Sequence, residues 1–523
     1  MEALTLRAAH TLPSPPSRPP PLSTPPRSIW RHTLYLLGAT YLARAVTALR
    51  SVLNARWLGP ELYGFWGSVS LLISFGHYLH GGLQDVTARD IPTSRRQGRP
   101  DAAQESVSQT LSVFGLMLGL ASILLWVKAW SLPSGTPSVL RVGWWVAGLV
   151  LPLEALWSFE QLVARADERF ASVSRNLVVT SVVSLLLTYW LVTRYQLPGL
   201  FVVAVATPGV GLWWLRRNAS FRWRIAWSWS RLAAMLRSGW PLLAIAFIVG
   251  ALSWVDQVIV LKMLGTTQFG YYALGGMLAQ LCLLFPTIVA SVMEPRVYFD
   301  YASQRQPSDV RAHVCLQLKA LALIMPLGLA CLDAILPTLI RVWLPAYEPA
   351  VPAMRILIWG SFLSGFTMCV RSFIVTLNRQ HQVLPVYVVA VAINALLSAL
   401  LAMRGLGLAG VAIGTVVAAA VCSGALALCV FRWLGDAPSR VVVRALVYSL
   451  PCLGLVLIME GPAWARTLWP SSGAARAMAV GQGLCLAAYA VSVGLMLPKW
   501  LRQAPGRSSS PSVNAPAASG VFA

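Results

Sequence analysis

The sequence predicts an all-α integral membrane protein of about fourteen transmembrane helices, built as two pseudo-symmetric six-helix bundles plus two C-terminal helices. The chain of 523 residues is 57% hydrophobic and only 11% charged, with a mean hydropathy of +0.65. Soluble domains carry about a quarter charged residues. Apolar windows long enough to cross a bilayer recur along the whole chain, and a pattern near residue 54 returns near residue 260.

The apolar windows give the spans in order. They fall at 33–53, 64–84, 108–130, 142–163, 174–193, 197–215, 239–262, 270–293, 315–340, 352–375, 384–403, 406–431, 442–460 and 477–498. The loops between them are too short to fold as domains. The function is therefore expected within the membrane, and an even number of spans places both termini on one side.

The domain organisation follows from these windows and from composition. Residues 1–29 are rich in Pro and Ser, with no apolar core before a cleavage site, which predicts a disordered cytoplasmic tail rather than a signal peptide. The remaining units are a helix bundle at 30–217, a basic cytoplasmic linker at 218–238, a second bundle at 239–435, two extra spans at 436–500 and a disordered cytoplasmic tail at 501–523.

The net charge of +23 reflects topology. Lys and Arg collect in the loops on the side of the termini, above all in 85–107, 164–175 and 216–238. Cytoplasmic loops of membrane proteins carry this excess. The charge thus indicates a multi-pass protein of the inner (plasma) membrane with both termini in the cytoplasm. No module typical of nucleic-acid binding is present, so nucleic acid is not expected as a partner.

Two matches indicate an internal repeat. Arg56-x-Leu58-Gly59 aligns with Lys262-x-Leu264-Gly265, and residues 166–191 parallel 377–402. Both matches occur in the same order at nearly one offset, and an even number of spans separates the halves, which gives them the same orientation. Repeated bundles around a central cleft are typical of secondary transporters.

Three stretches resemble one family. They are "RWLGPELYGFW" from Arg56, "SWVDQVIVLKMLGTTQFGYYALG" from Ser253, and "VVAVAINALLSALLAMRGLGLAGVAIGTVVA" at 388–418. In this order they resemble the polysaccharide-biosynthesis flippases of the multidrug/oligosaccharidyl-lipid/polysaccharide (MOP) exporter superfamily. The resemblance covers roughly 30–435, and the Pro-rich start and the high Arg and Trp content depart from it.

The resemblance implies a MATE-like fold whose two bundles enclose a cavity that opens to each side in turn. It implies a lipid-linked oligosaccharide as cargo, a polyprenyl-pyrophosphate glycan moved from the cytoplasm for cell-surface polysaccharide, O-antigen or lipopolysaccharide export. Such a head group cannot cross hydrocarbon unaided, because each buried unsatisfied polar group costs a few kcal/mol. Membrane lipids, a polysaccharide polymerase and glycosyltransferases are the expected partners, with no cofactor.

Three arginines on or beside the first span are the first cavity candidates. Arg44, Arg50 and Arg56 are spaced by six residues, so they cannot all lie on one helix face. Arginine suits a pyrophosphate because its planar fork binds oxygens bidentately and stays charged. The alternative is that some of them reach the lipid head groups or pair with a neighbouring helix.

Asp256 and Lys262 are the second pair of candidates. Asp256 precedes Lys262 by the same spacing that separates Arg50 from Arg56, so the repeat makes Asp256 the counterpart of Arg50. The two could face each other across the cleft as an ion pair that cargo or a proton breaks. A structural pair buried between helices is the alternative.

Weaker candidates complete the set. His77 and His80 share a helix face and could sense protons, although hydrogen bonds to neighbours are the plainer role. Asn394 could bond between helices, and Glu154 could line the cavity. Glu160 lies near a span end, where solvation is the plainer explanation. The tryptophans indicate an interfacial belt before sugar stacking.

Other chemistries are less well supported. All eight cysteines follow residue 280, without a CxxC pair or a His at metal spacing, so neither a disulfide nor a metal is expected. The sequence contains no P-loop, so ATP hydrolysis by this chain is not expected. The rivals are a MATE-type drug/cation antiporter with an acidic cavity, a glycan ligase or polymerase, and a scramblase or scaffold. An enzyme is not expected, because loops 131–141 and 461–476 lack His and paired carboxylates.

Overall fold

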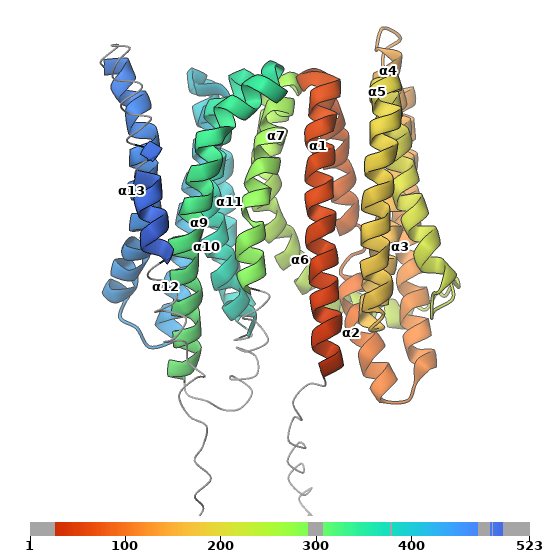
Figure 1. The fold of residues 1–523 in the computed structure, drawn as a ribbon. Coiled ribbons are helices and arrows are strands. Elements are labelled where there is room, and N and C mark those ends of the chain that lie inside the picture. The colour runs from red at the N-terminus through yellow and green to blue at the C-terminus, as the bar shows by residue number, and fades with distance from the viewer. Residues whose placement is uncertain (1–26, 291–306, 377–378, 469–481, 484, 495–523) are drawn as a thin grey trace, which may run out of the picture.

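The computed structural model describes residues 27–290, 307–376, 379–468, 482–483 and 485–494, and every regular element in these ranges is a helix. Two lobes stand side by side, with the N-terminal helices in one and the following helices in the other (Figure 1). The N-terminal lobe contains α1 (Arg27–Phe75), η1 (Gly76–Tyr78), α2 (Leu83–Arg96), α3 (Pro100–Trp130), α4 (Ser138–Ala166) and α5 (Phe170–Arg217). The all-α fold class predicted from the sequence is confirmed.

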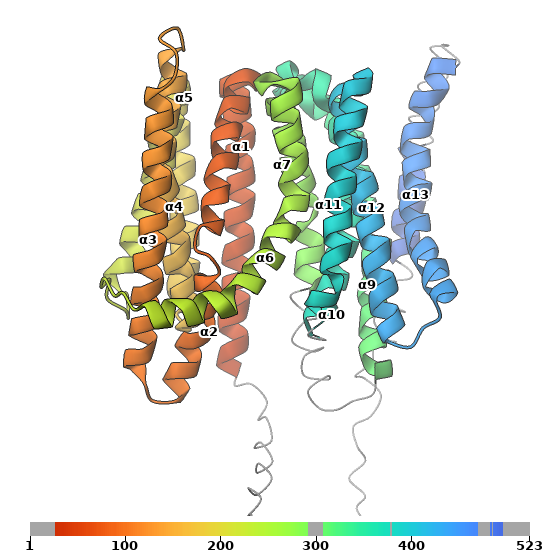
Figure 2. The same cartoon turned by 180° about the vertical axis from the view of Figure 1, so that it is seen from behind.

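The second lobe is built in the same way, and α13 stands at its outer edge (Figures 1 and 2). Its elements are α6 (Trp229–Ile259), η2 (Val260–Leu264), α7 (Thr266–Cys282), α9 (Pro307–Trp343), η3 (Pro345–Ala350), α10 (Val351–Thr376), α11 (Gln380–Leu401), η4 (Ala402–Leu406), α12 (Gly407–Trp433) and α13 (Pro438–Leu468). Both η2 and η4 are π-helical turns.

The number of spans is only partly established. Within the described residues, nine stretches are long and apolar enough to cross a membrane. Two of these, Phe170–Arg217 and Gln380–Trp433, each hold two of the predicted spans. Part of the predicted last span, 477–498, lies outside the described residues, as do nearly all of the first predicted tail and the whole of the second. The count of fourteen is therefore not fully confirmed.

One predicted boundary differs from the structure. The expected span 64–84 ends at Phe75, where η1 begins, and Gly82 (φ 84°) then starts α2. The predicted loop 85–107 consequently contains a helix. Glycines at 76, 81 and 82 interrupt the apolar run, while α2 itself buries three apolar residues together with Gln84 and Thr87 and leaves its arginines exposed.

The internal repeat is visible in the backbone. Gly59, inside α1, has φ 70° and ψ 174°, and Gly265, before α7, has φ 89° and ψ 178°. Positive φ is accessible to glycine because it has no Cβ. Pro60 then starts the descending half of α1, a position where its missing N–H is harmless. The aligned Leu-Gly pairs thus form the same reversal in each lobe.

The lobes touch closely just beyond these reversals. A Cβ on Gly64 would lie 1.9 Å from the carbonyl oxygen of Thr266, and a Cβ on Gly270 would lie 2.0 Å from that of Pro60. Because both glycines lack this atom, the backbones of α1 and α7 can approach directly. We call this end of the bundle the glycine end, and the opposite end, with the α2–α3 and α4–α5 turns, the basic end.

Three tyrosines pack beside this crossing. The ring of Tyr347, in η3, meets Tyr63 of α1 at 6.4 Å and Tyr271 of α7 at 5.6 Å, both edge-on. Tyr347 is only 1% exposed. These aromatic rings and the glycine contact close the space between the lobes at the glycine end.

Candidate functional site: a polar cavity between the lobes

A cavity of about 830 Å³ lies between α1 and the helices α6, α7, α10, α11 and α12. Its wall follows α10 from Leu357 to Arg371, a length of about 21 Å at the helical rise. Leu357 is near the glycine end and Arg371 is further toward the basic end. The cavity therefore runs along the bundle away from the closed glycine end.

Three charged side chains line this cavity in the described part of the chain: Arg50 of α1, Asp256 of α6 and Arg371 of α10. Arg50 and Asp256 lie at matching depths because each is nine residues before its reversal glycine, Gly59 or Gly265. Arg371 is exposed and lies closer to the basic end. The wall thus carries positive charge at two depths and one carboxylate.

The cavity also contains polar atoms that no protein group satisfies. In the described residues, Arg50 Nε, Asn54 Oδ1, Trp254 Nε1, Thr367 Oγ1 and Tyr387 OH are buried without a hydrogen-bond partner, and all five residues line the cavity. Buried polar groups are otherwise almost always hydrogen-bonded. These five atoms are also shielded from the cavity, so a partner there reaches them only when wall side chains move.

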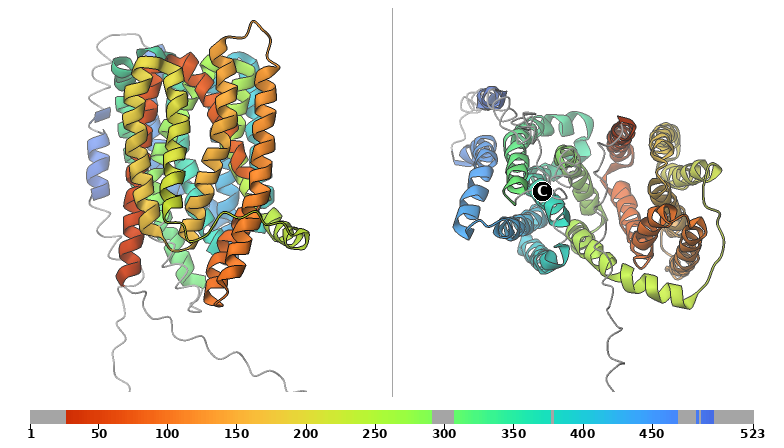
Figure 3. Two further views of the ribbon diagram at one scale, coloured as in Figure 1. Left: turned by 90° about the vertical axis from the view of Figure 1, so that its right-hand side faces the viewer. Right: turned by 90° about the horizontal axis from the view of Figure 1, so that it is seen from below.

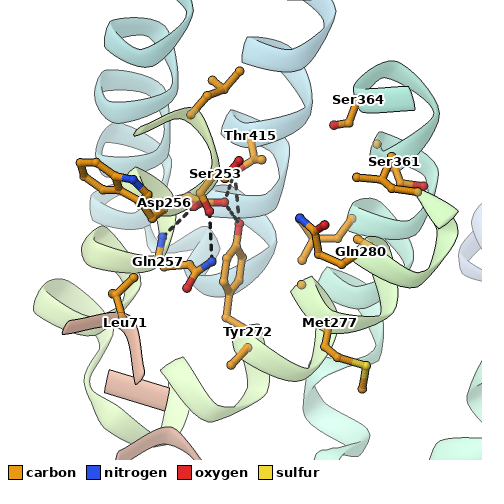
Figure 4. Close-up of a pocket in the computed structure, with 18 of the residues that line it drawn as sticks. Leu71, Ser253, Asp256, Gln257, Tyr272, Met277, Gln280, Ser361, Ser364 and Thr415 are labelled. Atoms are coloured by element: carbon orange, nitrogen blue, oxygen red, sulfur yellow. Dashed lines mark hydrogen bonds between the residues drawn. The ribbon is translucent and has the colours of Figure 1, made fainter. Parts of the chain in front are cut away.

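Asp256 is held by hydrogen bonds from three donors (Figure 4). The Tyr272 hydroxyl donates to Oδ2 at 2.6 Å and the Thr415 hydroxyl donates to the same oxygen at 2.9 Å. The backbone N–H of Gln257 donates to Oδ1 at 2.8 Å. Helices α6, α7 and α12 therefore meet at this carboxylate.

The opposite wall is also polar. Gln280 of α7 and Ser361 and Ser364 of α10 lie across the cavity from Asp256 (Figure 4). Asn394 lies behind the carboxylate: its Oδ1 accepts from the Ser398 hydroxyl at 2.9 Å and is 3.4 Å from Thr415 Oγ1. Asn394 therefore supports the hydrogen-bond network of Asp256 from α11, which is the role between helices that the sequence suggested. It does not line the cavity.

The structure separates the three arginines of α1. Arg50 lines the cavity, whereas Arg44 is exposed outside it. The Arg56 guanidinium lies 5.6 Å from the centre of the Trp343 ring, a cation–π contact with α9. Of the three, only Arg50 lines the cavity, and its electrostatic partners include Glu154 and Tyr63.

The expected ion pair between Arg50 and Asp256 is not formed. Asp256 accepts hydrogen bonds from Tyr272 and Thr415 instead, so its carboxylate is satisfied within its own lobe. Both residues face the same cavity, but from separate helices with the cavity between them. The repeat places them at equivalent positions and does not bring them into contact.

The other candidates lie outside the cavity wall. Lys262 is exposed on the π-helical turn. His80 accepts a hydrogen bond on Nδ1 from the Gly82 N–H at 3.0 Å and packs edge-on to Phe114. His77 lies within electrostatic reach of Glu154. The plainer role of hydrogen bonding to a neighbour therefore describes His80.

Glu160 differs from its expected solvation. It is 2% exposed, and its Oε1 accepts from Trp223 Nε1 at 2.6 Å and from Arg216 Nη1 at 3.2 Å. The chain after α5 folds back over this glutamate, so a residue near a span end becomes buried. Sequence distance from the span end could not show this.

Sequence reasoning missed Arg371 and Tyr272. A usable signal existed for Arg371, because it interrupts the apolar run "MCVRSFIV" just as Arg50 interrupts its own. Tyr272 offered no comparable signal, because one tyrosine in an apolar helix does not reveal which side chain its hydroxyl meets.

Comparison with solved structures agrees with this geometry. The chain is similar to an inward-facing multidrug resistance MATE family transporter of the MOP superfamily, with a TM-score of 0.62 and 14% identity over 77% of this chain and 95% of the other. It is similar to the lipid II flippase MurJ in an inward closed conformation, with a TM-score of 0.60 and 13% identity over 82% and 99%. A Vibrio cholerae MATE transporter matches with a TM-score of 0.57 and 17% identity over 78% and 98%.

The chain has the fold of these MOP superfamily transporters, with a cavity between its two lobes. A family model described as polysaccharide biosynthesis protein matches residues 53–346. The chain belongs to this polysaccharide biosynthesis protein family, as the resemblance had indicated. No curated protein matches the chain.

Proposed function

We propose that this chain is a flippase that moves a lipid-linked oligosaccharide, a polyprenyl-pyrophosphate glycan, across the bacterial inner membrane by alternating access. The cargo's anionic head would occupy the cavity while the polyprenyl tail stays in the bilayer. Membership in a polysaccharide biosynthesis family supports this cargo class.

The observation that carries the proposal is the chemistry of the cavity wall. Arg50 and Arg371 supply two guanidinium groups, and Arg50 Nε is one of five buried polar atoms of the wall residues that have no protein partner in the described part of the chain. Guanidinium groups bind phosphate oxygens bidentately. Hydroxyl and amide side chains such as Ser361 and Gln280 offer the donors and acceptors that sugars require.

The closed glycine end is consistent with a conformation that takes up cargo from the basic end. Tyr63, Tyr271 and Tyr347 seal this end, while the cavity extends toward the basic end. The positive-inside rule assigns the basic end to the cytoplasm. In this state the cargo would enter from the cytoplasmic leaflet, meet Arg371 first and then reach Arg50.

Reconstitution of the purified chain tests the proposal. Vesicles would hold a fluorescent polyprenyl-pyrophosphate oligosaccharide, and translocation would be read from its protection against a quencher added outside. We expect translocation by the wild-type protein and at least tenfold less by Arg50→Gln. A folded protein that moves none of several such lipids would overturn the proposal.

Asp256 favours a second candidate, a drug/cation antiporter of the same fold. This carboxylate lies in the cavity wall and forms no ion pair within the described residues. The antiporter would extrude cationic dyes in exchange for protons or sodium ions that move inward down their own gradient. Dye efflux that survives Arg50→Gln and Arg371→Gln but is lost with Asp256→Asn would favour it over the flippase.

A further inference from the structure

A segment at the basic end joins the two lobes. Residues 218–240, which we call the strap, comprise the chain after α5 and the first part of α6. The first part of α6 runs crosswise along one face of the bundle, above the α2–α3 turn, before the helix turns up into the second lobe (Figures 2 and 3). The strap therefore lies across the bundle axis, at the end where the basic loops gather.

The backbone of the strap is fixed to α3. The Gln104 side chain donates to the Arg222 carbonyl at 2.7 Å and accepts from the Arg222 N–H at 2.9 Å. The N–H groups of Ala226 and Ser228 donate to Ser112 Oγ at 3.0 Å and to Gln109 Oε1 at 2.9 Å. These bonds hold an irregular segment in one position, so its exposed side chains point in a fixed direction.

The helical part of the strap buries one face. Leu232 and Met235 are buried and cluster with Leu83 of α2. Gly239 meets Gly82 so closely that a Cβ on Gly82 would lie 2.2 Å from the Gly239 carbonyl oxygen. The opposite face has no protein neighbour in the described part of the chain and is exposed.

Large apolar side chains are exposed along the strap, one in its irregular part and two on its helix. Ile225 is 95% exposed, Trp229 is 72% exposed and Trp240 is 63% exposed. Holding such groups in water is unfavourable, whereas the bilayer interface accepts both aliphatic and indole side chains. The fixed backbone prevents Ile225 from folding back onto the protein.

Basic side chains accompany them. Arg222, Arg224 and Arg237 are exposed and form no ion pair among the described residues, whereas Arg231 pairs with Glu105 of α3. The strap contains neither Asp nor Glu. Arginines beside apolar side chains, with no acidic neighbour in the strap, match a leaflet of anionic phospholipids.

We propose that the strap is a binding surface for anionic phospholipids of the leaflet at the basic end. Ile225 and the tryptophans enter the interface, and Arg222, Arg224 and Arg237 contact lipid phosphates. This surface is separate from the cavity, and its lipid is a structural ligand rather than the cargo. The proposal does not depend on the cargo assignment.

Lipid-dependent stability tests the charge complementarity. The full chain is placed in nanodiscs of phosphatidylcholine alone or mixed with phosphatidylglycerol, an anionic lipid of the kind that attracts polybasic surfaces. We expect phosphatidylglycerol to raise the unfolding temperature of the wild type. The triple variant Arg222→Gln, Arg224→Gln, Arg237→Gln should lose most of that increase.

A matched control distinguishes the strap from basic charge in general. Arg89→Gln, Arg96→Gln and Arg99→Gln remove three exposed arginines of α2 and its turn at the same end. This control should keep the phosphatidylglycerol effect. An equal loss in both triple variants, or no effect in the wild type, would overturn the proposal.

The position of Ile225 provides an independent measurement. A spin label is attached at Ile225→Cys, or at Gln97→Cys in the exposed α2–α3 turn, in a variant without native cysteines. We expect oxygen to relax the label at 225 more than a water-soluble nickel chelate does, with the reverse at 97. A label at 225 that is as accessible to the chelate as the label at 97 would contradict insertion.

Discussion

Arg50 and Asp256 occupy equivalent positions in the two lobes, line one cavity and form no ion pair with each other. Asp256 is satisfied by Tyr272 and Thr415, whereas Arg50 keeps a buried Nε without a partner. The pseudo-symmetric pair is therefore chemically asymmetric. One member is an acceptor already bound within its lobe, and the other has a donor atom without a protein partner.

This asymmetry predicts the effect of removing Arg50. Arg50→Gln should reduce translocation of the lipid-pyrophosphate glycan about ten- to hundredfold, because a hydrogen bond to a charged group contributes about 1.5–3 kcal/mol. Arg44→Gln is the matched control: it removes a guanidinium from the same helix, but outside the cavity. Equal losses in the two variants would show that Arg50 acts through topology and not through contact with cargo.

Asp256 gives a second prediction. Asp256→Asn preserves the shape of the side chain but removes its charge and replaces one acceptor oxygen by a donor NH₂ group. We expect normal membrane insertion and a large loss of transport, measured in the same vesicles, because the network from Tyr272 and Thr415 is built around a carboxylate. Wild-type transport by this variant would remove Asp256 from the functional site.

The glycine end gives a third prediction. Gly64→Ala would place a Cβ 1.9 Å from the Thr266 carbonyl oxygen, so the lobes could no longer close at this end. A cysteine at Ser361 in the cavity should then react faster with an impermeant maleimide added at the glycine end.

Gly276→Ala is the control for this experiment. It lies on α7 and lines the cavity, but a Cβ there would meet no atom within 4 Å. It should leave the labelling rate unchanged. Slow labelling in a folded Gly64→Ala protein would show that the glycine contact does not form the seal.

A fourth prediction concerns the joint between the second lobe and α13. Arg355 binds Asp333 bidentately, with Nε–Oδ1 at 2.6 Å and Nη2–Oδ2 at 2.8 Å, and its Nε is 3.2 Å from Glu460 of α13. Asp333 is 0% exposed. Asp333→Leu should destabilise the protein by about 3–5 kcal/mol, because it leaves a charged partner poorly compensated.

Thermal unfolding in nanodiscs measures this effect. The double variant Asp333→Leu, Arg355→Met should recover part of the lost stability, since it removes the poorly compensated guanidinium and leaves only the partly exposed Glu460 without its partner. Arg341→Gln should change stability by at most about 1 kcal/mol, because its pair with Glu348 is exposed. Equal loss in the single and double Asp333 variants would show that packing, and not charge, holds this joint.

The sequence by itself determined the membrane class, the helical fold and the repeat. A bilayer leaves the backbone of each span no partner but its own helix, so apolar windows translate directly into helices. The repeated Leu-Gly pairs translate equally directly into reversals, because only glycine adopts the conformations found at Gly59 and Gly265 without strain.

Only the tertiary structure decided which polar residues form the site. Arg44, Arg50 and Arg371 all interrupt apolar runs in the sequence, yet helix rotation and packing place two of them in the cavity and leave the third outside. The partners of Asp256 come from α7 and α12, far along the chain. A one-dimensional pattern records that a charge lies within a span, but its direction depends on neighbours that are brought together only by folding.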